Sequence, residues 1–194
     1  MVFNYLSIVY IGILTKRKIK FFHDNKKRIY FIHNLFLTFL SSYMFFGILY
    51  EITDKKYKLI GNNYDINHVE LEHYIWIFYL SKYYEFIDTF LLILNNSKIL
   101  FLHVYHHSTV VLYVWMVVKY EPGGDYYIGP MLNSWVHIWM YLYYLLASMM
   151  NMEQRRKYLW WNKYLTQMQI LQFIINTTPD GTLKTNKKAL LQEQ

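Results

Sequence analysis

The chain has 194 residues, of which 55% are hydrophobic, 21% aromatic and 17% charged, and none is cysteine. An average soluble domain is about 45–50% apolar and about 25% charged, so the composition is shifted toward that of a membrane protein. The mean hydropathy of only +0.06 reflects 21 tyrosines and many lysines and asparagines, which lower the average while leaving the apolar runs intact. The lack of cysteine excludes disulfides, thiolate metal sites, iron–sulfur clusters and a cysteine nucleophile.

Six apolar segments follow one another along the chain, separated by short polar stretches: 3–14, 29–50, 73–94, 99–118, 131–150 and 160–176. A transmembrane helix needs about 20 residues, so the four middle segments are full-length spans and the two terminal ones are marginal. The sequence predicts an all-α, polytopic transmembrane helix bundle over residues 1–176 and a polar tail over 177–194. No internal repeat is visible, and the first segment lacks the basic start and cleavage site of a signal peptide.

Basic residues are distributed unevenly between alternate loops. Residues 15–28, 95–98 and 151–164 hold 12 lysines and arginines, whereas the loops on the opposite side hold four. Cytoplasmic loops of membrane proteins are enriched in basic residues, so the first set is expected in the cytoplasm. Membrane topology thus explains most of the net charge of +7, and binding to nucleic acid is not expected.

Ionisable side chains interrupt the apolar segments at helical spacing. Such groups are costly in a membrane and usually mark a functional site or a paired interior network. Lys82, Glu85, Asp88 and Thr89 lie at i, i+3, i+6 and i+7 and form one polar stripe. A self-neutralising Lys–Glu pair is the simpler interpretation of this stripe, but it leaves Asp88 without a partner in its own helix.

The next segment carries three histidines within five residues. His103 lies three and four positions before His106 and His107, so the three imidazoles share a helix face. Neutral imidazoles ligate metals, and they also act as nucleophiles or general bases. Of the eight histidines, only these three and His137 are expected to converge, because the other four lie early in the chain or on the far side: His23, His33, His68 and His73.

Two further stripes occupy the later segments. Asn133, His137, Met140, Tyr141 and Tyr144 share one face, and Thr166, Gln169 and Gln172 share another. Aromatic and methionine residues at this spacing usually pack in a core, and amides in a span often join helices. Together the stripes predict a buried polar site between facing helices, near their cytoplasmic ends, with an apolar cavity extending into the membrane.

The four motifs, in this order, resemble those of the very-long-chain fatty acid elongases, the ELO family of membrane 3-ketoacyl-CoA synthases. The motifs are Lys82-Tyr-Tyr-Glu85-Phe-Ile-Asp88-Thr89, His103-Val-Tyr-His106-His107, the stretch from Asn133 to Tyr144, and Thr166-Gln-Met-Gln169-Ile-Leu-Gln172-Phe173. The resemblance covers about residues 5–175. It implies a seven-helix enzyme of the endoplasmic reticulum membrane that extends a long-chain acyl-CoA by two carbons with malonyl-CoA and needs no cofactor or metal.

The resemblance also implies roles for the site residues. His106 is expected to take the acyl group as an acyl-imidazole, which the malonyl-CoA carbanion then attacks. His103, His107 and His137 are expected to handle protons, with Glu85, Asp88 and Lys82 as their polar partners in catalysis. The expected substrate contacts are Asn133, Tyr141, Tyr144, Gln169 and Gln172, with Lys98, Arg155, Arg156 and Lys163 meeting the CoA phosphates at the cytoplasmic mouth. Expected partners are the reductases and dehydratase of the elongation cycle and a second copy of the chain.

Family members are usually longer than this chain. The first span begins late, and no seventh span follows Phe173, so the sequence is expected to be truncated relative to its relatives at both ends. Two other hypotheses remain open. Di-iron membrane desaturases and hydroxylases share the histidine motif, although their sites usually need about eight histidines; the other alternative is an inactive membrane bundle protein.

Overall fold

The computed structural model describes residues 2–15, 20–64, 69–120 and 122–177, and these ranges form an all-α bundle without β-strands, as predicted. His68 and the tail beyond Thr177 lie outside the described residues. The helices are α1 (Val2–Thr15), α2 (Lys20–Asp54), α3 (Val69–Tyr84), α4 (Phe86–Leu94), α5 (Phe101–Tyr120), α6 (Ile128–Met149), α7 (Met152–Tyr158) and α8 (Asn162–Thr177), with a short 3₁₀ helix, η1 (Gly124–Tyr127), before α6.

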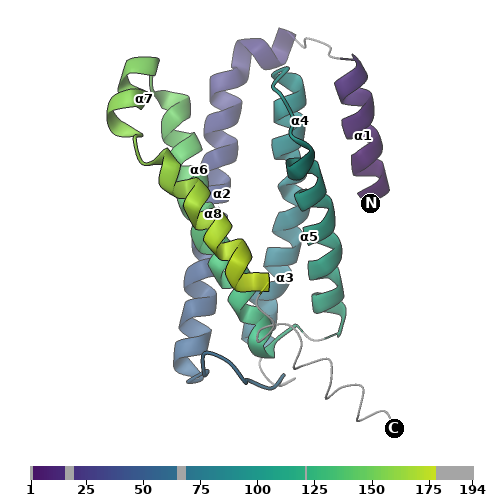
Figure 1. The fold of residues 1–194 in the computed structure, drawn as a ribbon, viewed down its shortest axis with the longest axis vertical. Helices are drawn as coiled ribbons and strands as arrows, with labels where there is room; N and C mark the ends of the chain where they lie inside the picture. The colour runs from purple at the N-terminus through teal and green to yellow at the C-terminus, as the bar shows by residue number, and fades with distance from the viewer. Residues whose placement is uncertain (1, 16–19, 65–68, 121, 178–194) are drawn as a thin grey trace.

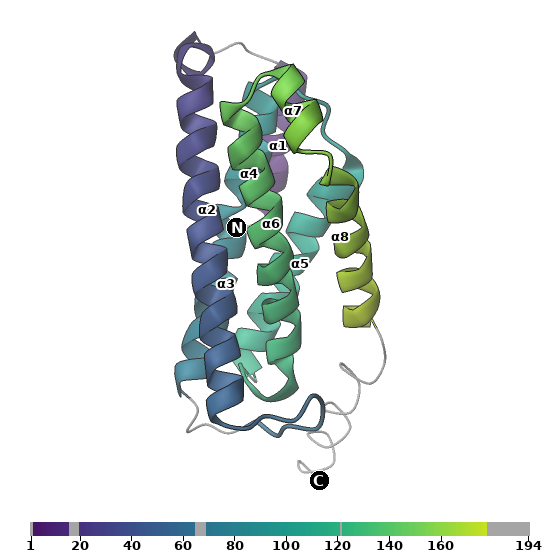
Figure 2. The same ribbon diagram turned by 90° about the vertical axis from the view of Figure 1, so that its left-hand side faces the viewer.

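The long helices pack side by side in an order that differs from their order in the sequence. The main packing contacts run from α5 to α3, from α3 to α2, from α2 to α6 and from α6 to α8. These helices therefore form an arc with α5 and α8 at its ends, and α1 packs outside it against α4 and α5 (Figures 1 and 2). This arrangement brings the residues on the inner faces of α2 to α6 together.

Each of the six apolar segments predicted from the sequence lies mostly in helical structure, with a few terminal residues of the last three outside α5, α6 and α8. Among the described residues, the helices Phe22–Asp54 and Phe101–Tyr120 are long and apolar enough to cross a membrane, and Val2–Leu14 is a shorter apolar helix. The segment 73–94 is divided between α3 and α4 at Glu85, whose carbonyl accepts a 3₁₀-type bond from the amide of Asp88 at 3.0 Å. The division places this carboxylate at a helix junction.

The distribution of side chains is that of a membrane bundle. Large apolar residues such as Phe39, Phe46 and Phe101 are exposed on the outside by 67%, 60% and 83%. Polar residues are buried inside, among them Lys82, which is 3% exposed. Apolar side chains facing outward suit lipid, and ionisable residues in spans face the bundle interior.

Local sequence sets the ends of several helices. Asn96 has a left-handed φ of 53°, and its amide and that of Ser97 bond back to the carbonyls of Ile93 and Leu92, which is a Schellman ending for α4. The predicted break over 95–98 is thus confirmed. In α7, Asn151 and Gln154 form a capping box.

Close packing of α2 on α3 depends on a glycine. A Cβ at Gly47 would overlap the ring of Tyr74, so only glycine lets the two helices approach this closely.

The end of the bundle that holds η1 is closed by hydrogen bonds between two connections. The Asp125 carboxylate accepts the backbone amides of Gly61 and Asn62 at 2.7 and 2.8 Å, and the Asn62 side-chain amide at 2.8 Å. Gly124 adopts a φ of +58°, and a Cβ there would lie 3.0 Å from the Asn62 carbonyl oxygen. We call this arrangement the Asp125 clasp; it ties the connection after α2 to the start of α6.

The opposite end carries the basic connections. The beginning of α2, the α4–α5 connection and α7 all lie there (Figure 1). Three of its basic residues, Lys98, Arg155 and Arg156, are exposed. The segments that sequence reasoning assigned to the cytoplasm, as far as the structure describes them, therefore share one end.

Candidate active site

A charged network occupies the middle of the bundle. Lys82 Nζ donates to Glu85 Oε1 at 2.7 Å and to Asn133 Oδ1 at 2.6 Å, which links α3 to α6. The same Glu85 oxygen lies 3.3 Å from His137 Nδ1. The Lys82 and Glu85 side chains are only 4% and 3% exposed, so each charge depends on the other for its stability in a low-dielectric interior. The Lys–Glu pair anticipated from spacing is present, but it also engages two residues from another helix.

Asp88 finds its partners on two other helices. Its Oδ1 lies 2.6 Å from Nε2 of His33 on α2, and its Oδ2 accepts the hydroxyl of Tyr141 on α6 at 2.7 Å. Sequence reasoning excluded His33 from the converging histidines, and that exclusion was wrong: packing of α2 against α6 brings its side chain to the site. Tyr141 is 1% exposed, and its hydroxyl proton points to Asp88 rather than to an open space.

A third group of bonds connects the histidine motif to the first helix. Thr89 Oγ1 lies 3.0 Å from His103 Nε2 and 2.8 Å from the hydroxyl of Tyr5 on α1. Tyr5 is 2% exposed and its ring stacks on Phe86 with centroids 4.0 Å apart. Sequence reasoning did not single out Tyr5, because one tyrosine among 21 carries no distinctive spacing.

His106 and His107, the other two histidines of the motif, differ from His103 in their contacts. The rings of His103 and His107 lie 4.4 Å apart, and those of His106 and His107 lie 5.7 Å apart, which confirms that the three share a face. The structure places His106 at an exposed position and His107 at a buried one. Within the described part of the chain, neither imidazole has a hydrogen-bond partner. His106 therefore combines an unengaged ring with access from outside.

The amides of α8 join that helix to α6. Asn133 Nδ2 donates to Gln172 Oε1 at 3.4 Å, and Gln169 Nε2 contacts Met140 Sδ at 3.3 Å. Gln172 thus extends the Lys82–Asn133 network, whereas Gln169 contacts the wall of a separate pocket. This is the role in helix joining that amides in a span often have.

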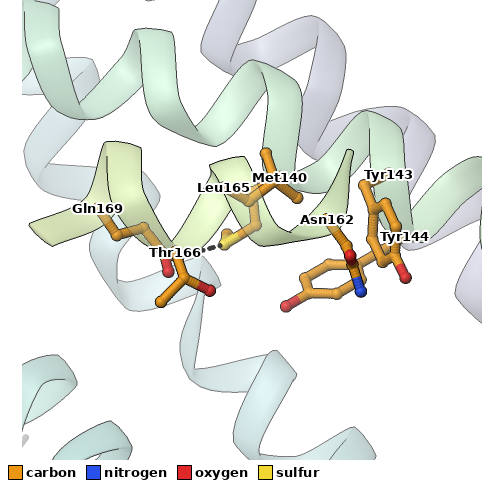
Figure 3. Close-up of a pocket in the computed structure, with 7 residues that line it drawn as sticks. All are labelled: Met140, Tyr143, Tyr144, Asn162, Leu165, Thr166 and Gln169. Carbon is orange, nitrogen blue, oxygen red and sulfur yellow. Dashed lines mark hydrogen bonds between the residues drawn. The ribbon is translucent and has the colours of Figure 1, made fainter. Parts of the chain in front are cut away.

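A pocket of about 200 Å³ lies between α6 and α8 (Figure 3). It is lined by Met140, Tyr143, Tyr144, Asn162, Leu165, Thr166 and Gln169. Tyr144 and Gln169, two of the residues predicted to bind substrate, therefore line the same pocket. Lys163, which follows the pocket residue Asn162 in the sequence, is exposed.

The histidines and carboxylates of the site do not form a metal centre in the described part of the chain. Among the residues that the structure describes, no three His, Asp or Glu side chains are grouped so as to hold a metal ion. The Glu85 oxygen nearest to His137 also accepts the ammonium of Lys82, which in turn donates to Asn133, so this carboxylate is already part of an ion pair.

Comparison with known proteins identifies the family. The family model described as ELO, the GNS1/SUR4 family, matches residues 1–187. The rat very long chain fatty acid elongase 5 is 39% identical over 176 residues, and the mouse very long chain fatty acid elongase 2 is 40% identical over 152 residues. These alignments cover 88% and 76% of this chain but only 57% and 51% of the relatives. The chain thus spans about half the length of the curated relatives that it matches, and by the family match it belongs to the GNS1/SUR4 (ELO) family.

Proposed function

We propose that the chain catalyses the condensing step of fatty acid elongation in the endoplasmic reticulum membrane. The substrates are a long-chain acyl-CoA and malonyl-CoA, and the product is a 3-ketoacyl-CoA two carbons longer. The names of the relatives, very long chain fatty acid elongases, support this reaction class. The observation that carries the proposal is the histidine face of α5, where His106 has no hydrogen-bond partner among the described residues while His103 contacts Thr89. On the facing helix α6, His137 lies against Glu85.

His106 acts as the nucleophile in this proposal. Its ring nitrogen attacks the thioester carbonyl, the carbon–sulfur bond breaks, and CoA leaves after taking a proton. Covalent catalysis of this kind divides one difficult condensation into two easier steps. A neutral, accessible imidazole suits this role better than one whose nitrogen is already bound to a carboxylate.

Carbon–carbon bond formation follows. Malonyl-CoA loses carbon dioxide, the resulting carbanion attacks the acyl carbon, and the bond from that carbon to the His106 nitrogen breaks. The departing imidazole takes up a proton from solvent, which replaces the proton that CoA carried away, and the 3-ketoacyl-CoA is released. Buried donors near the reacting carbonyl stabilise charge that develops in the transition state, and His107, next to His106, and the Lys82 network are the groups available for this.

The substrate enters from the basic end. CoA phosphates favour arginine and lysine. Lys98 in the α4–α5 connection and Arg155 and Arg156 in α7 are exposed at that end, and Lys163 is exposed at the start of α8. The pocket lined by Tyr144, Asn162 and Gln169 lies on the side of α8 and provides polar contacts for part of the CoA moiety.

A condensation assay tests the proposal. Membranes containing the full chain are incubated with acyl-CoA and labelled malonyl-CoA, and the labelled 3-ketoacyl product is measured across acyl lengths. We expect product with the wild type and a loss of at least about 10³-fold with His106→Gln. His73→Gln is the matched control, because His73 lies at the other end of α3 and is exposed; it should retain activity.

Two outcomes overturn the proposal. Absence of product from a folded wild-type chain indicates a protein without condensing activity, as in the inactive bundle hypothesis. Iron at stoichiometric amounts in the purified protein, with desaturated or hydroxylated products, indicates a di-iron enzyme instead.

A further inference from the structure

His33 is a buried histidine whose contacts extend into the candidate active site from α2. Its ring is 5% exposed, and Nε2 lies 2.6 Å from Asp88 Oδ1. The other oxygen of the same carboxylate accepts the Tyr141 hydroxyl at 2.7 Å. One carboxylate therefore connects α2, α4 and α6.

Aromatic neighbours fix the plane of the His33 ring. The ring stacks on Tyr84 with centroids 5.5 Å apart and an interplanar angle of 14°. The edge of Tyr141 meets it at 90°, with centroids 6.4 Å apart. Because these two tyrosine rings restrict rotation of the imidazole, Nε2 can point to Asp88 in only a narrow range of directions.

The connection continues from Tyr141 to a histidine of the site. The Tyr141 ring meets the His137 ring edge-on, with centroids 5.4 Å apart and an angle of 83°. His137 Nδ1 lies 3.3 Å from Glu85. His137 is thus held by a carboxylate on one side and by a tyrosine on the other, and that tyrosine is itself held by Asp88.

We propose that His33 is a positioning residue for the condensing site: it holds Asp88, which holds Tyr141, which sets the orientation of His137. This rests on the function proposed above, but the geometry can also be tested without it. An ionised carboxylate only accepts hydrogen bonds, so His33 donates through Nε2 while Tyr141 donates its hydroxyl proton. Tyr141 then serves as a wall for His137 and not as a donor to the oxyanion.

Substitutions at His33 separate the hydrogen bond from the packing of the ring. His33→Phe keeps a flat ring against Tyr84 and removes the donor, whereas His33→Gln keeps an N–H donor near the position of Nε2. We expect His33→Phe to lower kcat of the condensation about 10–100-fold with little change in KM, because small misplacements of catalytic groups have effects of this size. His33→Gln should recover most of the loss.

The matched control is the neighbouring buried amide. Asn34 is 3% exposed, and its side chain donates to the Tyr30 carbonyl within α2 at 2.7 Å. Asn34→Leu therefore perturbs the same helix without reaching the site, and it should keep the wild-type kcat. A second control is the pair His33→Phe and Tyr141→Phe: if both act through one connection, the double variant loses no more than either single one.

Nuclear magnetic resonance of the histidine ring nitrogens tests the connection from His33 through Asp88 and Tyr141 to His137, and it does not require that the protein be active. In protein labelled with ¹⁵N-histidine, with the signal of His137 assigned by a His137→Gln variant, we expect His33→Phe and Tyr141→Phe to shift that signal alike and His33→Gln to leave it in place. A wild-type chain without condensing activity would remove the proposed function but leave this test intact. An unmoved His137 signal in His33→Phe, or equal losses of kcat in the Phe, Gln and Asn34→Leu variants, overturns the positioning role.

Discussion

Lys82 and Glu85 form an ion pair of 2.7 Å in the interior of the bundle, with side chains that are 4% and 3% exposed. Lys82 also lies over the Phe78 ring, with Nζ 4.3 Å from the ring centroid. Two charges in this setting support each other, because neither can be hydrated and each would be costly alone. The pair is the centre of the candidate site, since it reaches both Asn133 and His137.

Removal of one member of this pair should destabilise the protein strongly. We expect Glu85→Leu or Lys82→Met to lower the free energy of unfolding by about 3–5 kcal/mol, because each leaves an uncompensated buried charge. The double variant should recover most of that loss while remaining inactive. Thermal unfolding in detergent measures this, and equal destabilisation of the single and double variants would contradict a coupled pair.

Tyr5 should influence the histidine motif through Thr89. Tyr5→Phe keeps the ring that stacks on Phe86 and removes only the hydroxyl that bonds to Thr89. We expect the free energy of unfolding to fall by about 1 kcal/mol, the typical net worth of a hydrogen bond, and the kcat of condensation to fall with it. The control is Tyr10→Phe on the same helix, whose side chain is 66% exposed. A Tyr5→Phe variant with unchanged stability and kcat would show that the bond has no effect on the site.

The Asp125 clasp should stabilise the end of the bundle opposite to the basic connections. Asp125→Ala removes a carboxylate that accepts two backbone amides and one side-chain amide. Bonds to charged groups each contribute about 1.5–3 kcal/mol, and partial solvent access reduces the sum, so we expect a loss of about 2 kcal/mol. Hydrogen exchange at the amides of Gly61 and Asn62 should accelerate in the variant. Unchanged exchange there would contradict the clasp.

The orientation in the membrane can be measured without background, because the chain has no cysteine. Met152 in α7 is 73% exposed and Leu59 at the opposite end is 79% exposed. In sealed microsomes, an impermeant maleimide should label Met152→Cys directly and Leu59→Cys only after permeabilisation. The reverse pattern would contradict the cytoplasmic placement of the basic end.

Helical periodicity predicted much of the site. Lys82, Glu85 and Asp88 form one stripe, and the three histidines share one face, because both follow from 3.6 residues per turn in apolar segments. The Asn133–His137–Tyr141 stripe likewise faces these residues. Where polar or ionisable residues recur at helical spacing in an apolar segment, the sequence alone shows which side chains share a helix face.

The rest depends on how helices pack against one another. His33 and Tyr5 are single polar residues in apolar helices, and nothing in their spacing predicts that α2 and α1 bring them to Asp88 and Thr89. The break at Glu85 was also not predicted, since no glycine or proline marks it. The positions of His33 and Tyr5 arise from contacts between segments more than 50 residues apart, which a pattern along the chain cannot reveal.

The proposed mechanism requires His106 to carry the acyl group, and mass spectrometry of the intact intermediate tests this most directly. The chain is incubated with acyl-CoA in the absence of malonyl-CoA, digested, and sequenced across Phe101–Tyr120. We predict an acyl mass on His106 that disappears when malonyl-CoA is added, with an equal amount of 3-ketoacyl-CoA formed, and no adduct in His106→Gln. An acyl group on another residue, or turnover by the His106→Gln variant at the wild-type rate, would contradict the account.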